Sequence, residues 1–364
     1  MNILHIDFER NWRGGQQQAV YLYKKLIEHG INSNFICRSG SKLAEYFKSE
    51  KIPYYNIDII NEIDIFAALK ISRIVKKHNF SIIVLHSAHA LSIGILIKLF
   101  FVRNIKLVAI RRVDFTIRKN FLSLLKYSNK YVDIIVVISR FIEGVLLKDG
   151  ISKDKLKLIY SAIDLEKFEN LKKVDDFKKN YNIPEHHTVI GTVAALVDHK
   201  DYPTLLRAAE LVLKNRSDIT FFIAGDGNLK QQLVGLAAEL GISRNIIFAG
   251  YIKDAWKILL NFDIFLITSK MEGLGTTILD AQAVGLPIIA TAGGGIPEIV
   301  KDGYNGLLAP IGDYKKVAEH IFTLLENKEL KDRLSFNGRK FVQNFSIEKQ
   351  FFEYLDLFNI LEKN

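Results

Sequence analysis

Cysteine is nearly absent from this sequence, since Cys37 is the only one among 364 residues. A single cysteine excludes a disulfide within the chain and is typical of a protein kept in a reducing compartment. Cys37 follows two apolar residues, Phe35 and Ile36. We therefore expect a small buried side chain rather than a reactive thiol.

Long hydrophobic runs are missing as well. The longest apolar stretch, "ALSIGILIKLFFV", is interrupted by Lys98 and is shorter than the roughly 20 residues that span a bilayer. The N-terminus does not resemble a signal peptide, because it lacks a basic start and Asp7 and Glu9 break its short apolar run. These absences predict a cytoplasmic protein that is at most peripheral on the inner face of a membrane.

The sequence also lacks a dinucleotide-binding fingerprint, Gly-x-Gly-x-x-Gly, after its first predicted strand. The "GGQQQA" that follows this strand has a different spacing. Gly225 and Gly227 begin such a pattern later, but Lys230 occupies the place of the third glycine. A nicotinamide-dependent dehydrogenase is therefore disfavoured.

Positive charge is abundant and unevenly spread. The net charge is +10, with +11 over residues 1–170 and −1 over residues 171–364. This asymmetry favours an anionic partner, such as a membrane surface, a nucleic acid or an acidic substrate, although an ordinary solvated surface explains it equally well. A nucleic acid is the least favoured partner, because no recognised binding module is present.

Apolar runs alternate with amphipathic stretches, which predicts an α/β protein with parallel sheets covered by helices on both faces. The alternation breaks around residues 159–187 and then restarts. We expect two Rossmann-like, doubly wound domains over residues 1–165 and 166–345, followed by an amphipathic helix at 346–364 that packs on the second domain or crosses back to the first. The predicted strands are residues 2–6, 32–38, 81–87, 105–111, 132–139, 155–161, 188–196, 218–227, 245–251, 263–269, 286–292 and 305–310.

Gly14 and Gly15 follow the first predicted strand, and we expect a helix to begin near Gln16. Glycines let the backbone approach a ligand closely, and the free amides at a helix start attract anions. Arg13 is placed to assist. A tight strand-to-helix turn without a ligand is the alternative interpretation.

The main site signal is "MEGLGTTILDAQAVG", which starts at Met271. It predicts a loop with Glu272, then a helix capped by Thr276 that contains Asp280 one turn later. The amides at the start of this helix form a phosphate cradle. A later turn, "TAGGGIPE", offers similar amides.

Two carboxylates beside a phosphate cradle repel the phosphate unless they contact other groups. Hydroxyls are natural partners, because a carboxylate accepts two hydrogen bonds from a vicinal diol. This favours a sugar nucleotide, with Glu272 and Asp280 binding its two sugars. Lys200, which precedes a helix in the first unit of the second domain, is placed to neutralise a leaving diphosphate.

These motifs together resemble the retaining glycosyltransferases of family four, which have the GT-B fold. "EGLGTTILDAQAVGLPIIATAGGGIPEIV" is similar to the C-terminal signature of that family, a Glu-x7-Glu motif followed by "GGxPE". "LIYSAIDLEKF" is similar to its interdomain motif, and "IAGDG", "IIFAGY" and "DIFLITS" occur in the expected order. The resemblance covers nearly the whole chain.

The resemblance implies two domains that face a cleft, with a nucleoside-diphosphate sugar bound to the C-terminal one. It implies transfer of a hexose to a hydroxyl with retention of the anomeric configuration, without a metal ion or a cofactor, and the chain has no Asp-x-Asp motif. By position, Glu272 contacts the donor sugar, Asp280 the ribose and Lys200 the diphosphate. The other residues implied for the donor site are Gly14, Gly15, Gly225, Gly275, Thr276 and Thr277.

Three positions depart from the family pattern. Asp280 stands where the second motif glutamate is usual, and Ala195 stands where a phosphate-binding arginine is usual. The histidine that usually follows the strand ending at Ile110 is absent. We expect Arg111 (or its neighbour Arg112) to supply the missing charge and His89, in a loop, to serve as the catalytic histidine.

The implied acceptor is a glycan or a lipid-linked molecule of the cell envelope, as in lipopolysaccharide synthesis. A basic amphipathic stretch at 117–131, with Arg118, Lys119, Lys126 and Lys130 beside Phe121, Leu122, Leu125 and Tyr127, predicts contact with an anionic membrane, and a core-packed helix explains it equally well. Alternatives with the same fold are a sugar-nucleotide epimerase or a phosphorylase. A non-catalytic sugar-nucleotide binder is the alternative from another class.

Overall fold

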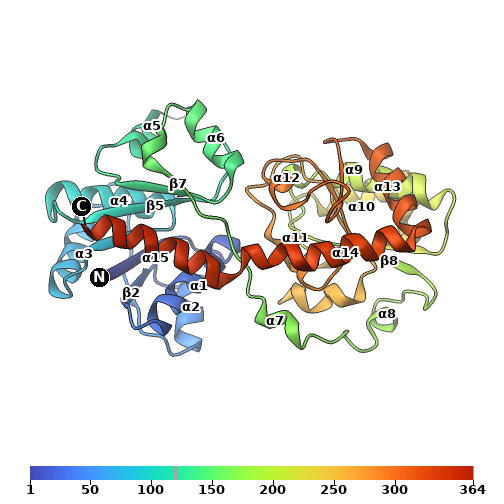
Figure 1. Cartoon of the computed structure of the whole chain (residues 1–364), viewed down its shortest axis with the longest axis horizontal. Coiled ribbons are helices and arrows are strands. Elements are labelled where there is room, and N and C mark those ends of the chain that lie inside the picture. The colour runs from blue at the N-terminus through green and yellow to red at the C-terminus, as the bar shows by residue number, and fades with distance from the viewer. Residues whose placement is uncertain (119–120, 364) are drawn as a thin grey trace. The chain divides into compact units, whose positions relative to one another are not determined.

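Runs of buried apolar residues form two separate sheets in the computed structural model, which describes residues 1–118 and 121–363 (Figure 1). β4 (Ile82–Leu85) and β9 (Ile219–Ala224) are buried along their whole length. Strands that are buried on both faces are typical of a parallel sheet between two layers of helices. Within each of the two sheets, every pair of neighbouring strands is parallel.

The first sheet has seven strands in the order β3-β2-β1-β4-β5-β6-β7. Its other strands are β1 (Asn2–Asp7), β2 (Asn32–Cys37), β3 (Tyr55–Asn56), β5 (Lys106–Arg111), β6 (Ile134–Val137) and β7 (Leu156–Leu158). The helices around it are α1 (Gly14–Glu28), α2 (Lys42–Ser49), α3 (Ile65–Lys77), α4 (Ala88–Phe100), α5 (Phe121–Ser128), α6 (Arg140–Lys148) and α15 (Ile347–Lys363). The sequence pattern missed β3, because two residues are too few to show an alternation.

The second sheet has six strands in the order β10-β9-β8-β11-β12-β13. Its other strands are β8 (Thr188–Val193), β10 (Ile246–Gly250), β11 (Ile264–Ile267), β12 (Ile288–Thr291) and β13 (Leu307–Ala309). The helices of this part are α7 (Glu166–Glu169), α8 (Phe177–Asn180), α9 (Tyr202–Leu213), α10 (Lys230–Glu239), α11 (Thr276–Ala283), α12 (Ile296–Ile299), α13 (Tyr314–Glu326) and α14 (Lys328–Val342). The predicted fold class, two doubly wound α/β sheets, is confirmed.

Each sheet has one point where the order of the strands reverses. In the first sheet the chain moves outward from β1 to β2 on one side and from β4 to β5 on the other. In the second sheet β8 and β11 are the corresponding neighbours. Ligands of doubly wound sheets bind beyond the carboxyl ends of the strands at this reversal. The loops after β1, β4, β8 and β11 are therefore where a site is expected.

The two sheets belong to two compact units. The first unit is Met1–Ala162 together with the chain from Ile347 onward, and the second is Ile163–Ser346. Cys37 is buried in the first unit, as its apolar neighbours predict. No helix in the described part of the chain has both the length and the apolar character that crossing a bilayer requires.

Helix α15 packs on α1, although more than 300 residues separate them in the sequence. Gln350 Nε2 donates to Gln18 Oε1 at 3.0 Å and to the Tyr160 carbonyl at 2.8 Å. Phe351 and Phe358 are buried, and Phe351 stacks on His29 with a ring separation of 4.2 Å. The amphipathic end of the chain therefore crosses back and belongs to the first unit.

We expect Phe358→Ala to lower the free energy of unfolding by about 3 to 5 kcal/mol, because it leaves a cavity beneath α15. Phe352→Ala on the same helix is the matched control: Phe352 is 54% exposed, whereas Phe358 is 0% exposed. We expect the control to cost less than about 1 kcal/mol. Urea unfolding of both variants measures the difference, and equal losses would contradict the docked position of α15.

Candidate functional site

Lys200 and Glu272 meet at the strand reversal of the second sheet. Lys200 lies in the loop after β8, Glu272 lies in the loop after β11, and the two strands are adjacent. Lys200 Nζ forms a close ion pair with Glu272 Oε1, to which Ser269 Oγ also donates at 3.0 Å. Glu272 is buried, and Lys200 is partly buried. The structure thus brings together two predicted site residues that lie 72 positions apart.

Hydrogen bonds to backbone carbonyls tie these two loops to each other. The amide of Lys270 donates to the His199 carbonyl at 2.8 Å, and Thr268 Oγ1 donates to the Asp201 carbonyl at 3.0 Å. Because both ends of the ion pair are on loops held in this way, the carboxylate and the ammonium are placed before any ligand arrives.

The glycine triplet Gly293, Gly294 and Gly295 packs against the Glu272 loop. A Cβ on Gly294 would lie 2.2 Å from the Glu272 carbonyl oxygen, and one on Gly293 would lie 2.2 Å from that of Ser269. The amide of Gly295 donates to the Glu272 carbonyl at 2.8 Å. The prediction that this turn offers its amides to a ligand is thus wrong for Gly295, because that amide holds the Glu272 loop.

Helix α11 begins beside this loop. Gly275 is its N-cap residue, in the left-handed region at φ 92°, and Thr276 is its first helical residue. The prediction of Thr276 as the cap is therefore wrong, because only glycine adopts this backbone conformation without strain. No side chain caps the helix. The Ile278 amide donates to the Gly275 carbonyl at 2.9 Å, whereas the amides of Thr276 and Thr277 precede the first hydrogen bond of the helix and can bind an anion.

Asp280 lies about one turn into α11 and is partly buried. Burial raises the pKa of its carboxyl from 3.8 to about 7, and the charge of Lys167 opposes this rise. Lys167 comes from α7, in the stretch that resembles the interdomain motif, and sequence reasoning missed it. The lysine in "DLEKF" was the available signal, but its approach to Asp280 requires the folded second unit.

Gly225 follows β9 and has a structural role. A Cβ there would lie 1.9 Å from the Ala194 carbonyl oxygen, and the Gly225 amide donates to the Gly250 carbonyl at 2.8 Å. Its amide is therefore occupied within the second unit. The glycine allows the loop after β9 to pack against the loop after β8, which also carries Lys200.

Gly14 and Gly15 start α1 at the strand reversal of the first sheet, so the helix begins two residues before the predicted Gln16. Arg13 is the N-cap residue, and its amide donates to Gln16 Oε1 at 3.0 Å. Gln16 Nε2 in turn donates to Asp7 Oδ2 at 2.8 Å. Burial raises the pKa of Asp7, and its hydrogen bonds from the Glu9 amide and Gln16 oppose that rise.

Arg112 lies beneath Gly15, where its Cδ would be 3.4 Å from an added Cβ. Its Nη2 lies 3.1 Å from His86 Nδ1, and His86 Nε2 lies 2.9 Å from His5 Nδ1. A guanidinium can only donate, so His86 accepts at Nδ1 and carries its proton on Nε2. Burial, together with the Arg112 charge, lowers the pKa of both imidazoles, that of His5 to about 3. A neutral His86 therefore contacts the arginine, and His5 in turn holds His86.

The side chain of Arg111 contacts a different part of the first unit. Its guanidinium lies over the rings of Phe115 and Tyr127, and Nη2 donates to the Phe115 carbonyl at 2.7 Å. Consecutive residues of a strand point to opposite faces of the sheet, so only one of two adjacent arginines can reach the glycine loop. Of the two arginines expected to supply the missing charge, Arg112 is the one at Gly15.

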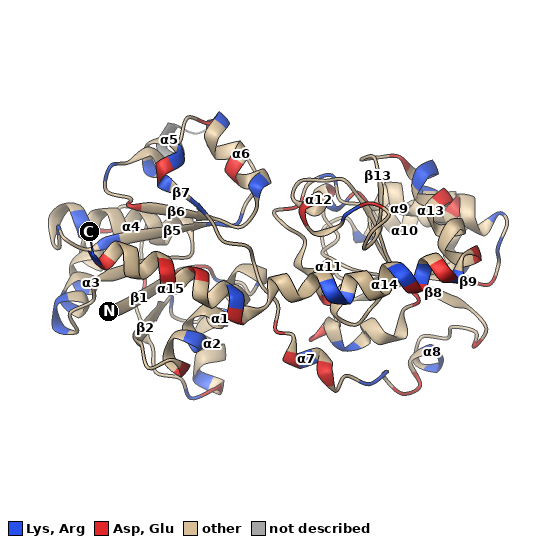
Figure 2. Cartoon of the chain, viewed as in Figure 1, with Lys and Arg blue, Asp and Glu red and all other residues tan. Residues whose placement is uncertain are grey.

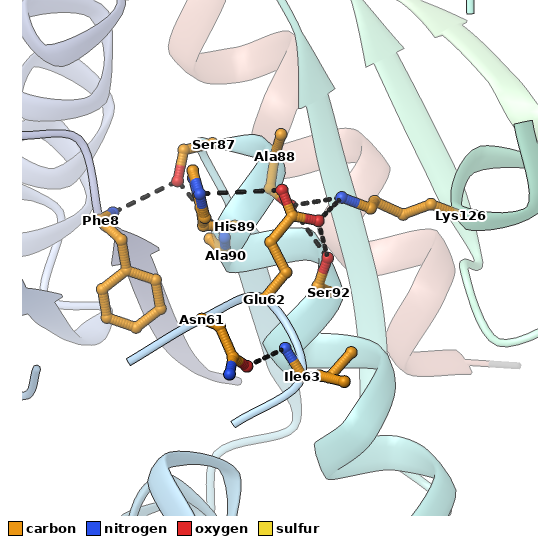
Figure 3. Close-up of polar contacts among 10 residues, drawn as sticks. All are labelled: Phe8, Asn61, Glu62, Ile63, Ser87, Ala88, His89, Ala90, Ser92 and Lys126. Carbon is orange, nitrogen blue, oxygen red and sulfur yellow. Dashed lines mark hydrogen bonds and ion pairs between the residues drawn. The ribbon is translucent and has the colours of Figure 1, made fainter. Parts of the chain in front are cut away.

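His89 is the second residue of α4 and so lies in the first turn of a helix, not in a loop as predicted. Figure 3 shows its ring beside Glu62, with Nε2 3.7 Å from Oε1. Glu62 also accepts from Ser92 Oγ at 3.1 Å and pairs with Lys126 of α5. The loop that carries Glu62 is thereby fixed to α4 and α5 near the carboxyl edge of the first sheet.

The stretch predicted to meet a membrane, 117–131, folds partly inward. Tyr127 is buried against Arg111, and Lys126 is paired with Glu62, while Leu125 is exposed. Lys119 and the side chains of Phe121 and Leu122 lie outside the described residues. Two of the residues that motivated the membrane prediction are therefore used in internal contacts.

We expect Gly294→Ala to destabilise the protein far more than Gly303→Ala. Both glycines have positive φ, 61° and 70°, so both substitutions introduce left-handed strain of roughly 1–2 kcal/mol. A Cβ at Gly294 would also clash with the Glu272 backbone, whereas no atom lies within 4 Å of a Cβ at Gly303. Thermal unfolding of both variants makes the comparison, and equal shifts would mean that the triplet does not support the Glu272 loop.

Asp280 should make stability depend on pH. Its folded-state pKa of about 7 is above the ordinary 3.8, so the folded state holds the proton more tightly than the unfolded chain. The free energy of unfolding should therefore decrease as pH rises from about 5 to about 8, relative to Asp280→Asn, which cannot titrate. Urea unfolding of both proteins at each pH gives the difference. A constant difference would show that this carboxyl is ionised throughout the range.

The whole chain matches known proteins. A family profile described as "Glycosyltransferase Family 4" matches residues 12–167, and one described as "Glycosyl transferases group 1" matches residues 173–341. The chain is 25% identical to N-acetyl-alpha-D-glucosaminyl L-malate synthase of Bacillus anthracis, over 92% of this chain and 90% of that protein. It is 23% identical to UDP-Gal:alpha-D-GlcNAc-diphosphoundecaprenol alpha-1,3-galactosyltransferase of Escherichia coli, over 98% and 96% of the two chains. It spans 62% of the length of another relative, putative glycosyltransferase EpsD of Bacillus subtilis, at 27% identity.

Solved structures show the same fold. A glycosyltransferase from Rickettsia africae superposes with a TM-score of 0.87 at 22% identity, over 100% of this chain and 99% of that one. HepE of Anabaena, in complex with UDP and glucose, superposes with a TM-score of 0.85 at 19% identity, over 99% of each chain. Both parts of the chain match family profiles, and the fold is that of the GT-B enzymes. The protein thus belongs to glycosyltransferase family four.

Proposed function

We propose that this protein is a retaining glycosyltransferase that moves a hexose from a nucleoside-diphosphate sugar to a hydroxyl of a glycan or lipid-linked acceptor of the cell envelope. The observation that carries the proposal is the buried Lys200–Glu272 pair at the strand reversal of the second sheet. It lies beside the uncapped start of α11, where free amides favour a phosphate.

In the proposed complex, Lys200 and the first amides of α11 hold the diphosphate of the donor. Negative charge develops on the diphosphate as its bond to the sugar breaks. Hydrogen-bonding groups of the protein that are already in place stabilise this charge without reorganising. Glu272 accepts hydrogen bonds from the donor sugar. An ionised carboxylate has about four acceptor positions, so it can bind a hydroxyl while it still contacts Lys200 and Ser269.

Asp280 is the proposed partner of the ribose. A vicinal diol donates two hydrogen bonds to a carboxylate, which favours the charged form of Asp280 and should lower its pKa on binding. The side chain of Asp280 is one methylene shorter than the glutamate that is usual at this position of the family motif.

In the first unit, Arg112 is the proposed source of the positive charge that the chain lacks at Ala195. The neutral His86 contacts its guanidinium under Gly15, at the start of α1. A cation and free helix amides in one place favour an anionic group of the donor. The sequence left this role open between Arg111 and Arg112, and the guanidinium of Arg111 lies over two aromatic rings instead.

The names of relatives support an acceptor of the cell envelope. The E. coli relative is named for a GlcNAc carried on diphosphoundecaprenol, and another relative, from Rhizobium meliloti, for lipopolysaccharide core biosynthesis. For this chain we propose a lipid-linked or glycan acceptor of that type, reached from the cytoplasmic side of a membrane. UDP-sugars are the first donors to test, because the HepE complexes contain UDP.

Donor binding tests the proposal directly. We expect a UDP-sugar, or another nucleoside-diphosphate sugar, to raise the melting temperature of the protein. Glu272→Ala and Lys200→Ala should each weaken binding by roughly thirtyfold, because each removes a charged hydrogen-bonding group. Each shift is measured from the variant's own ligand-free melting temperature, since loss of one partner leaves a buried charge. Lys253→Ala, at an exposed lysine, should bind like the unchanged protein.

Turnover then separates the proposed enzyme from its alternatives. With a lipid-linked or glycan acceptor, NMR of the product should show the anomeric configuration of the donor, and activity should persist in EDTA. Consumption of donor without an acceptor would indicate an epimerase or a phosphorylase. Binding without any turnover would indicate a sugar-nucleotide sensor. Normal donor binding by both Glu272→Ala and Lys200→Ala would refute the assigned site.

A further inference from the structure

Helix α3 of the first unit has two contrasting faces. Its buried residues are Ala67, Ala68, Ile71, Ser72 and Val75, which face the core. Opposite them, Phe66, Lys70, Arg73 and Lys77 follow at intervals of four, three and four residues, and all four are exposed. At 3.6 residues per turn this spacing places them in one line along the helix. The outward face is thus one aromatic residue followed by three cations.

The cations of α3 have no ion-pair partner in the part of the chain that the structure describes. The helix contains no Asp or Glu, as Figure 2 also shows. Among the residues that the structure describes, neither this line of cations nor the neighbouring Lys76 forms an ion pair. Four unpaired positive charges within two turns favour an anionic surface as partner.

An apolar tip lies at the N-terminal end of this line. Ile60 is 88% exposed, Ile63 is 75% exposed and Phe66 is 79% exposed. The Ile60 amide donates to Asp64 Oδ2 at 2.9 Å, and Asp64 also caps α3 through the Ala67 amide at 2.9 Å. The loop is therefore folded onto the start of the helix and holds its two isoleucines next to Phe66. Three large apolar side chains this exposed in one place mark an interaction site.

Among the described residues, none of the three carboxylates of this loop forms an ion pair with a cation of α3. Asp58 accepts from the Ser39 amide at 3.1 Å, and Asp64 is the helix cap. Glu62 points away from the tip toward α4 and pairs with Lys126, as Figure 3 shows. Glu62 thereby anchors the loop while Ile63, the next residue, faces solvent.

We propose that the apolar tip and the outward face of α3 bind the surface of an anionic lipid bilayer. Ile60, Ile63 and Phe66 insert below the headgroups, while Lys70, Arg73 and Lys77 contact their phosphates. A bilayer fits better than a protein groove because exposed apolar side chains and unpaired cations occur together on one outward surface, and a bilayer offers acyl chains and anionic headgroups to both.

Binding to a bilayer would bring a lipid-linked acceptor to the protein, and this step of the inference rests on the proposed function. Helix α3 starts at the carboxyl edge of the first sheet, where the loop after β1 carries Gly14 and Gly15. A bilayer held at the tip would present the headgroup of such an acceptor at this edge. Membrane contact thus moves from the predicted stretch 117–131, whose Tyr127 and Lys126 are used internally, to α3 and its loop.

Flotation of the full-length protein with vesicles tests the proposal, using phosphatidylglycerol–phosphatidylcholine mixtures and pure phosphatidylcholine. We expect binding only to the anionic vesicles, and weaker binding at high salt. Replacing Lys70, Arg73 and Lys77 by Gln should weaken it about a hundredfold. Replacing Ile60, Ile63 and Phe66 by Ser should weaken it at least tenfold. A matched control replaces Lys253, Arg333 and Lys340, three exposed cations of the second unit, by Gln and should bind normally.

Phe66→Trp provides a second measurement that requires no loss of binding. The tryptophan fluorescence of this variant should shift to shorter wavelength when anionic vesicles are added. The unchanged protein, which contains Trp12 and Trp256, should show a smaller shift. Absence of vesicle binding by the unchanged protein, or normal binding by both triple variants, would overturn the proposal. A dimer that Phe66→Ser dissociates, without vesicle binding, would show that the face binds a second copy. The donor melting shift should be equal in all these variants, so failure of docking is distinguishable from failure of the proposed chemistry.

Discussion

A carboxylate buried at a sheet edge is stable only when it is paired, and this constraint organises the second unit. Glu272 has lost most of its water, so Lys200 and Ser269 must supply hydrogen bonds in its place. These partners come from loops after two adjacent strands, which parallel pairing holds about 4.8 Å apart. The glycine triplet lets a third loop pack against the first two without side chains in between. The pair therefore depends on the sheet order, and the position of the α11 amides depends on the same loop.

The first unit meets a similar constraint with other chemistry. Arg112 is held under Gly15 by an imidazole that burial keeps neutral and that a second imidazole holds in turn, while Gln16 satisfies the buried Asp7. A neutral acceptor holds the guanidinium without forming an ion pair, although the charge of the buried Asp7 also acts on it, and the arginine can still contact an anion. Both units thus present a cation and the start of a helix at the point where their strand order reverses. The two arrangements differ in one respect, since Lys200 is paired with a carboxylate and Arg112 is not.

Helix α3 shows how one short segment serves the fold and an outer surface together. Its small residues pack on the core, and its opposite face carries only cations after Phe66. The loop before it is fixed by Glu62 and Asp64, so the exposed isoleucines are held in place by polar contacts and not by burial. An exposed apolar cluster costs solubility, and its retention on a rigid loop is understandable if a bilayer covers it.

The sequence by itself determined the strands other than β3, the two-sheet fold and the residues of the Glu272 loop. Periodic burial and glycine-rich motifs are local properties, so they can be read along the chain. It did not determine which of Arg111 and Arg112 faces the glycine loop, because a shift of one residue in a strand reverses the face. It also placed Thr276 as a cap and His89 in a loop, since helix starts are uncertain by one or two residues. The Lys200–Glu272 pair, the approach of Lys167 to Asp280 and the exposed tip of α3 were decided only by the tertiary structure. Each depends on contacts between segments distant in the sequence or on which side chains the core leaves uncovered, and no local pattern encodes either.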